Sequence, residues 1–170
     1  MRRTFAALLA AAGCLAAAAA QAQGVNAVLI NPDGKEIGNV AISEVAQGVR
    51  IFAQAAELPP GVHAFHIHET GACDPPDFES AGGHYNPTDK QHGWDNPEGP
   101  HAGDFPNVHV HDDGRLAVEY FTSAVTLGDG DTTLFDDDGS AIVMHEGADD
   151  YQTDPAGAAG GRIACGVIAR

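Results

Sequence analysis

Basic residues are scarce in this sequence. Eight lysines and arginines stand against 24 aspartates and glutamates, and the formal net charge at pH 7 is −16. A field of this sign repels phosphate backbones and anionic lipid surfaces, which excludes binding to nucleic acid or to a membrane through overall charge. Methionine is nearly absent as well, because only Met1 and Met144 are present. The chain therefore lacks the thioether-rich composition of soft copper-binding sites.

Cysteine is limited to Cys14, Cys73 and Cys165. We expect Cys14 to be removed with an N-terminal signal, which leaves an even pair in an oxidising compartment. A disulfide between Cys73 and Cys165 is the favoured interpretation, and its loop would span 92 residues (165 − 73). Two reactive thiols are the alternative, but the sequence has no C-x-x-C motif and export disfavours them.

Long apolar runs are absent except at the N-terminus. Arg2 and Arg3 precede the apolar stretch Phe5–Ala20, and Ala20-Gln21-Ala22 has the small-x-small pattern of a cleavage site. This arrangement is typical of a secretory signal peptide, and the alanine-rich run is too weakly apolar to span a membrane. We predict a signal peptide over residues 1–22.

Cleavage would leave residues 23–170 as one domain of 148 residues (170 − 22), with a formal charge of −18 after the loss of two arginines. The expected location is periplasmic or secreted. The letters AAGC ending at Cys14 weakly match a lipoprotein processing site, so lipid anchoring at Cys14 is a minor alternative. Without that lipid, no membrane association is expected.

No stretch after the signal peptide has the 3.6-residue apolar period of an amphipathic helix. Short β-type runs recur between turn-forming Gly, Pro, Asn and Asp residues. The predicted strands are VNAVLI, EIGNVAISEV, GVRIFAQAA, VHAFHIHE, VHVH, RLAVEYF, SAIVMHEG and RIACGVIAR. Together they predict an all-β fold, an eight-stranded antiparallel barrel or sandwich. Two long loops, about residues 70–107 and 148–161, are of a length that usually serves function.

Histidine is where the chemistry of this chain concentrates. In AFHIHET, His66 and His68 are two residues apart in a predicted strand, so both rings project from one face while Phe65 and Ile67 face the core. The same spacing recurs in VHVH (residues 108–111), at His109 and His111. Spacing alone therefore does not define a metal site, and we interpret the VHVH pair as solvated or structural.

Other histidines in the sequence are possible metal ligands alongside this pair. His84, His92 and His101 lie in the first long loop, Asp104 follows three residues later, and His145 ends a later strand. Imidazole suits copper and zinc, and a carboxylate is an acceptable zinc ligand. A loop with three histidines and an aspartate could close a tetrahedral zinc site, and the metal would order that loop.

Six blocks of the sequence resemble the sequence motifs of a known protein family. HAFHIHETGAC, AGGHYNP, KQHG, PHAGDFPNV, MHEGADD and GGRIACGVI occur in the order and spacing of copper-zinc superoxide dismutases. The resemblance covers essentially the whole chain after the signal peptide. It implies a Greek-key β-barrel, copper and zinc as cofactors, and superoxide as the substrate, which is converted to oxygen and hydrogen peroxide. It also implies a homodimer.

The resemblance further implies a role for each matching residue. The copper ligands would be His66, His68, His84 and His145. The zinc ligands would be His84, His92, His101 and Asp104. His84 would bridge the two metals and donate a proton, Asp149 would link a copper histidine to a zinc histidine, and Arg162 would attract superoxide at the mouth of the copper channel.

Three other functions use the same residues. A metal carrier could hold copper or zinc in this cluster without turnover, although the near absence of methionine counts against it. A structural domain with an inactive site would need a ligand to be missing, and none is. A mononuclear zinc hydrolase fits the ligand types, but no residue stands out as its general base.

Overall fold

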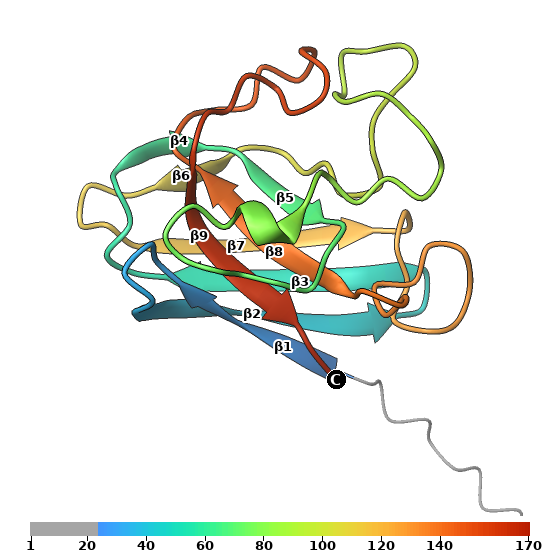
Figure 1. Ribbon diagram of the computed structural model, residues 1–170, viewed down its shortest axis with the longest axis horizontal. Helices are drawn as coiled ribbons and strands as arrows, with labels where there is room; N and C mark the ends of the chain where they lie inside the picture. The colour runs from blue at the N-terminus through green and yellow to red at the C-terminus, as the bar shows by residue number, and fades with distance from the viewer. Residues whose placement is uncertain (1–23) are drawn as a thin grey trace, which may run out of the picture.

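The computed structural model describes residues 24–170, and these fold into nine β-strands and one short 3₁₀ turn (Figure 1). The predicted signal peptide, its cleavage site and Cys14 lie outside the described residues. The elements are β1 (Gly24–Ile30), β2 (Glu36–Val45), β3 (Gly48–Ala55), β4 (Gly61–His63), β5 (Phe65–His68), η1 (Glu79–Ala81), β6 (Val108–Val110), β7 (Leu116–Thr122), β8 (Ser140–His145) and β9 (Arg162–Ile168). Within residues 24–170, no helix is long and apolar enough to cross a membrane.

Seven strands form one antiparallel sheet in the order β5-β8-β9-β1-β2-β3-β7, and β4 pairs with β6 in a small second sheet. The chain crosses from one end of the large sheet to the other after β3 and again after β7, as expected for Greek-key connections. The sheet curls so that its two ends enclose a common core (Figure 1). The prediction of an all-β antiparallel fold is confirmed.

The predicted strand VHAFHIHE is divided in two, which raises the strand count from eight to nine. Its middle residue, Ala64, donates its N–H to Gly147 and accepts a bond from the N–H of His145. Ala64 thus separates two strand pairings. Before it, β4 pairs with β6, and after it, β5 pairs with β8. The division turns β5 toward the edge of β8, where the histidines gather.

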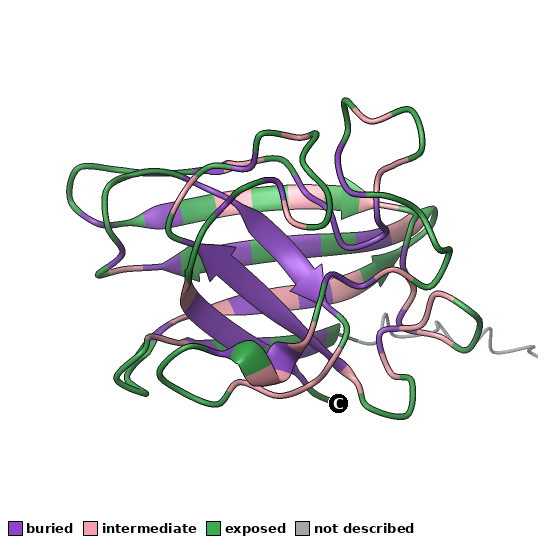
Figure 2. Ribbon diagram, turned by 45° about the horizontal axis from the view of Figure 1, so that its top comes forward, coloured by how far each residue is buried: buried purple, intermediate pink, exposed green. Residues whose placement is uncertain are grey.

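Strands β5 and β8 are buried on both faces, unlike β3, whose exposed and buried residues alternate (Figure 2). Phe65 and Ile67 of β5 pack in the main core, as their spacing predicts. The outer side of β8 is covered by a smaller cluster around η1. Its buried members are Phe78, Ala81, Ala141, Val143 and Cys165. Strand β8, which pairs with the strand that carries His66 and His68, is thus covered on its outer side.

A disulfide joins Cys73 to Cys165, with 5.7 Å between the two Cα atoms. This confirms the predicted pairing and ties the start of the first long loop (residues 69–107) to β9. Arg162, at the start of β9, donates hydrogen bonds to the carbonyls of Phe78 (2.6 Å) and Gly82 (2.7 Å). The segment between Cys73 and Gly82 is therefore attached to β9 at several points.

The first long loop meets the second long loop (residues 146–161) at the top of Figure 1. The backbone N–H of Asp95 donates to the carbonyl of Tyr151 at 2.9 Å, which joins the two loops directly. A third long connection, residues 123–139, buries Val125, Leu127 and Leu134 and so closes the core between β7 and β8. None of the eight predicted strands falls in that segment.

Candidate metal centre

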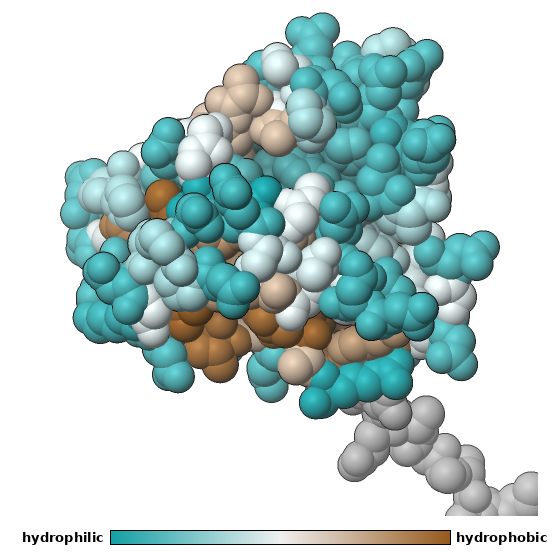
Figure 3. Space-filling model, viewed as in Figure 1, coloured by the Kyte–Doolittle hydropathy of each residue, from teal (hydrophilic) through white to brown (hydrophobic). Residues whose placement is uncertain are grey.

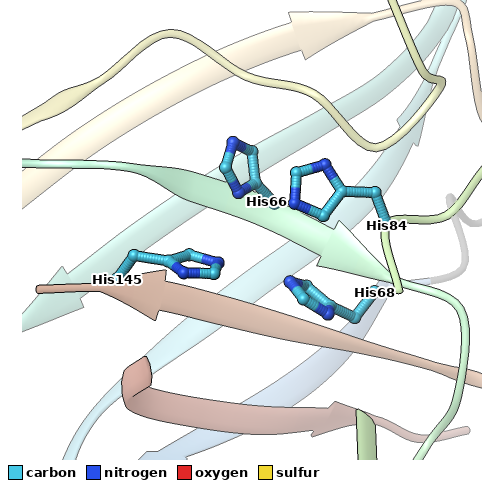
Figure 4. A group of neighbouring side chains, drawn as sticks. All are labelled: His66, His68, His84 and His145. Carbon is cyan, nitrogen blue, oxygen red and sulfur yellow. The ribbon is translucent and has the colours of Figure 1, made fainter. Parts of the chain in front are cut away.

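Four imidazole rings surround one point beside β5 (Figure 4). His66 and His68 project from the same face of β5, as their spacing predicts, and His145 comes from the end of the neighbouring strand β8. His84 joins them from the first long loop. One nitrogen from each ring lies within 4.8 Å of the others, which is close enough for a single metal ion to bind all four. We call these four residues the copper set, after the metal that the sequence resemblance implies for them.

The loop that carries His84 is attached to β5 by its backbone. Tyr85 donates its N–H to the carbonyl of Ile67 (2.8 Å), and Ile67 donates to the carbonyl of Gly103 (2.9 Å). At Gly103 a Cβ atom would lie 2.3 Å from the carbonyl oxygen of Ile67, so only glycine allows this approach. The pairing places His84 and the adjacent Asp104 against the strand that holds His66 and His68.

Hydrogen bonds fix the orientation of three rings of the copper set. His66 Nε2 donates to Asp149 Oδ2 (2.8 Å), His68 Nδ1 to the carbonyl of Gly82 (2.9 Å), and His145 Nδ1 to the carbonyl of Gly160 (3.1 Å). The opposite nitrogens of these three rings, together with Nε2 of His84, are buried without any hydrogen-bond partner. The four atoms are His66 Nδ1, His68 Nε2, His84 Nε2 and His145 Nε2. Buried polar atoms of native proteins normally have a partner, so four unpaired nitrogens at one point fit a metal ion.

Burial keeps these rings neutral, which is the form that binds metals. It lowers the pKa of His66 to about 3, that of His68 to about 2 and that of His145 to about 4, and it also lowers the pKa of His84. The positive charge of Arg162 acts in the same direction on His68 and His145. At neutral pH each ring therefore has a free lone pair for a metal.

A second group of possible ligands adjoins the first and shares His84. Its members, which we call the zinc set, are His84, His92, His101 and Asp104, all buried. His84 Nδ1 lies 2.8 Å from Asp104 Oδ1 and 3.4 Å from His101 Nδ1, while its Nε2 belongs to the copper set. Three imidazoles and one carboxylate are a suitable tetrahedral donor set for zinc.

Asp104 also organises the loop around it. Its Oδ2 accepts the backbone N–H groups of Gly93 and His101, both at 3.0 Å. Burial alone would raise the pKa of Asp104, but hydrogen bonds from His101, His84 and His92 outweigh burial and hold that pKa well below its usual range. For His92, burial is likewise outweighed by hydrogen bonds to Asp104 and Asp149, which raise its pKa to about 9. Asp104 is therefore anionic at any physiological pH, which is the form that can bind a metal.

Asp149 connects the two sets from the second long loop. Its Oδ2 accepts from His66 Nε2, and its Oδ1 accepts from His92 Nε2 at 2.9 Å. Asn107 fixes Asp149 in turn, since its side chain bonds both the N–H (2.8 Å) and the carbonyl (2.9 Å) of Asp149. The sequence pattern did not single out Asn107, because an amide that bonds a distant backbone leaves no signal in one sequence.

The remaining histidines lie outside both sets. His63 is buried, and its two ring nitrogens lie 2.9 Å and 2.8 Å from the carbonyls of His145 and Pro59. His109 and His111 are exposed. Neither belongs to a possible metal-binding group within residues 24–170. The fold and the two joined sets together describe an antiparallel β-barrel with two possible metal-binding groups that share His84.

Comparison with known proteins identifies the family. The model of the copper/zinc superoxide dismutase family matches residues 36–168. Superoxide dismutase [Cu-Zn] 1 of Aquifex aeolicus is 51% identical over 151 residues, which cover 88% of this chain and 89% of that protein. The chain belongs to the copper/zinc superoxide dismutase family, as the resemblance of its sequence blocks predicts.

Solved structures agree with this assignment. A double mutant of a SOD-like protein from Bacillus subtilis superposes with a TM-score of 0.83 and 45% identity, over 85% of this chain and 97% of the other. The Cu/Zn superoxide dismutase from Brucella abortus gives a TM-score of 0.70 and 30% identity, over 86% and 100% of the two chains.

Proposed function

We propose that the protein dismutates superoxide, converting two superoxide anions and two protons into oxygen and hydrogen peroxide. The observation that carries this proposal is the convergence of four unpaired, buried imidazole nitrogens on one point, beside a zinc-type set that shares His84. Copper, when bound, supplies one-electron redox chemistry there, and zinc supplies a redox-inert charge. The relatives named superoxide dismutase support the same activity.

The test combines metal analysis with a superoxide-dismutation assay on the purified protein. We expect copper and zinc in equal amounts, about one of each per chain, together with dismutation. A protein that holds zinc alone and does not turn over superoxide would support the carrier or structural alternatives. A chain with every ligand in place and copper bound, yet without activity, would contradict the proposal.

In this proposal His84 ligates both metals, through Nε2 on the copper side and Nδ1 on the zinc side. The support is its position in both sets and the proximity of its Nδ1 to Asp104 and His101. When its Nε2 is not ligating, that atom can hold a proton and deliver it to the reduced oxygen species. Burial disfavours a positive charge on the ring, so the proton is readily released.

Arg162 is proposed to attract the anionic substrate. Its guanidinium is partly buried, and two carbonyls of the first long loop hold it. It shares the carbonyl of Gly82 with His68 Nδ1 and pairs with His145 across β8 and β9, so it lies close to the copper set. A local positive group is needed because a chain with a charge of −16 repels superoxide at long range.

Lys90 is a second candidate for steering the substrate, because few other basic residues remain. It is exposed and precedes His92 in the first long loop. We expect Lys90→Gln to lower the rate of dismutation about twofold at low ionic strength, and to have little effect once salt screens the charge. Rate measurements across a salt series check this. An identical salt dependence in wild type and variant would contradict a steering role.

Export is proposed for the protein in its active form. The disulfide is consistent with an oxidising compartment, and the signal pattern of residues 1–22 supports a periplasmic or secreted domain of residues 23–170.

We also propose a homodimer, supported by hydrophobic residues that gather along the lower edge of Figure 3, over β1. The intact mass of the exported protein tests the cleavage site, and sedimentation tests the dimer. An N-terminus other than Gln23 would contradict the proposed cleavage, and a monomer would contradict the proposed dimer.

A further inference from the structure

His101 is the zinc-set residue whose ring is least restrained. Its Nδ1 faces the other ligands, 3.4 Å from both His84 Nδ1 and Asp104 Oδ1. Its Nε2 points away from them and makes no hydrogen bond with any residue in the range 24–170. By contrast, His66, His68, His92 and His145 each bond a carboxylate or carbonyl through the nitrogen opposite the proposed metal. Such outer bonds orient metal-binding histidines and raise their basicity.

The carboxylate that faces the free nitrogen of His101 belongs to Asp154. Asp154 Oδ1 lies 4.0 Å from His101 Nε2, and the same oxygen accepts the backbone N–H of His92 at 2.7 Å. Asp154 therefore lies beside the His92 N–H and the His101 ring, whereas Asp149 bonds the His92 ring. Both aspartates come from the second long loop, so that loop reaches the zinc set at two separate points.

Hydrogen bonds within the second long loop hold the backbone on both sides of Asp154. Asp150 accepts the N–H groups of Gln152 (2.9 Å) and Thr153 (2.8 Å), which closes a tight turn just before Asp154. The carbonyl of Thr153 then accepts the N–H of Gly157 at 2.7 Å. Asp154 extends from this turn toward the zinc set, although its side chain remains half exposed.

His101 is also the zinc-set side chain most open to solvent. It is 7% exposed, whereas the side chains of His92 and Asp104 are fully buried. It lines a surface pocket of about 380 Å³, together with Lys90, Trp94 and Ser123. A ligand ring that borders solvent and lacks an outer bond is the place where a bound ion would be released first.

On the basis of the proposed function, we propose that Asp154 is a positioning residue for the zinc site: it accepts the His101 Nε2–H and restrains that ring against release of the ion into the pocket. A shift of about 1 Å in either side chain would bring the pair from 4.0 Å to hydrogen-bond distance. The Asp154 carboxylate would then accept a hydrogen bond from the outer nitrogen of His101, as Asp149 does from that of His92. Asp154 touches neither substrate nor the copper set.

The test is the rate at which a chromophoric chelator removes zinc from the copper- and zinc-loaded protein. We expect Asp154→Asn to release zinc about tenfold faster than wild type, because the amide keeps an acceptor for the His92 N–H but loses the charge beside His101. Asp154→Ala should be at least as fast. Cobalt bound in place of zinc should show an altered visible spectrum in both variants, which a purely structural loop change would not produce.

Asp95→Asn is the matched control. Asp95 is exposed, lies in the same loop as His92, and loses the same charge, yet its side chain makes no hydrogen bond or ion pair among residues 24–170. If Asp154→Asn releases zinc no faster than Asp95→Asn, the inference is overturned. A wild type that takes up no zinc would overturn this inference and the proposed function together. Normal zinc uptake and dismutation with equal release rates would overturn this inference alone.

Discussion

Replacing His145 with alanine is expected to abolish dismutation while zinc remains bound. His145 supplies one of the four nitrogens of the copper set, from β8, and it does not belong to the zinc set. The loss of a direct ligand should exceed the roughly 10- to 100-fold effect of changing an outer partner, so we expect a fall in rate of about 10³-fold or more. Copper and zinc contents, measured beside the dismutation rate, check both parts of this expectation.

His109→Ala provides the control for His145→Ala. His109 is an exposed histidine on β6 and lies outside both sets, so its loss should leave rate and metal content unchanged. Because the outer bond of His145 runs to the backbone of Gly160, no other side chain loses a partner in the variant. Unaltered dismutation in His145→Ala, without a copper signal, would refute the assignment of the redox site.

The second large effect concerns stability. Replacing Cys73 and Cys165 together with alanine removes a bond that spans 92 residues. On the chain-entropy model, opening a loop of that length lowers the free energy of unfolding by about 4 to 5 kcal/mol. Cys165 is fully buried beside Phe78 and Ala81, so the variant also loses packing against η1. We expect urea to unfold the metal-free variant at a much lower concentration than the metal-free wild type.

Metal-free protein is used so that metal binding does not add to the stability of either form. Wild type treated with a reductant is the internal control, because it loses the same bond without a change of side chain. Its unfolding free energy should fall to nearly that of the variant. A difference of less than about 1 kcal/mol between oxidised wild type and the variant would contradict the stabilising role of the disulfide.

The side chains of both metal sets could be located from the sequence because they occur in blocks with fixed order and spacing. Strand alternation placed His66 and His68 on one face. It did not predict that the face would be buried, since the residues that cover it, His84, Asp104 and Asp149, come from the two long loops. Alternation describes one strand, whereas burial on both faces depends on what the rest of the chain brings to it.

The outer partners of the histidines could not be predicted in the same way. His68 and His145 bond the carbonyls of Gly82 and Gly160, and any residue has a carbonyl. Asn107 and Asp154 bond the backbone of residues more than 40 positions away. These contacts depend on how two long loops dock, and no local pattern records that docking. The division of one predicted strand at Ala64 has the same origin, because its partners are His145, at the end of β8, and Gly147, just beyond it.

The burial of β5 and β8 on both faces has a consequence for how the protein opens. Amide groups of strands covered on both sides exchange with solvent only when a large part of the domain unfolds, whereas surface loops open at much lower free energy. Three of the four copper-set rings are carried by β5 and β8, while every member of the zinc set lies in the first long loop. The copper half of the centre therefore belongs to the last cooperative unit to unfold. The zinc half can come apart through partial opening that leaves the barrel intact.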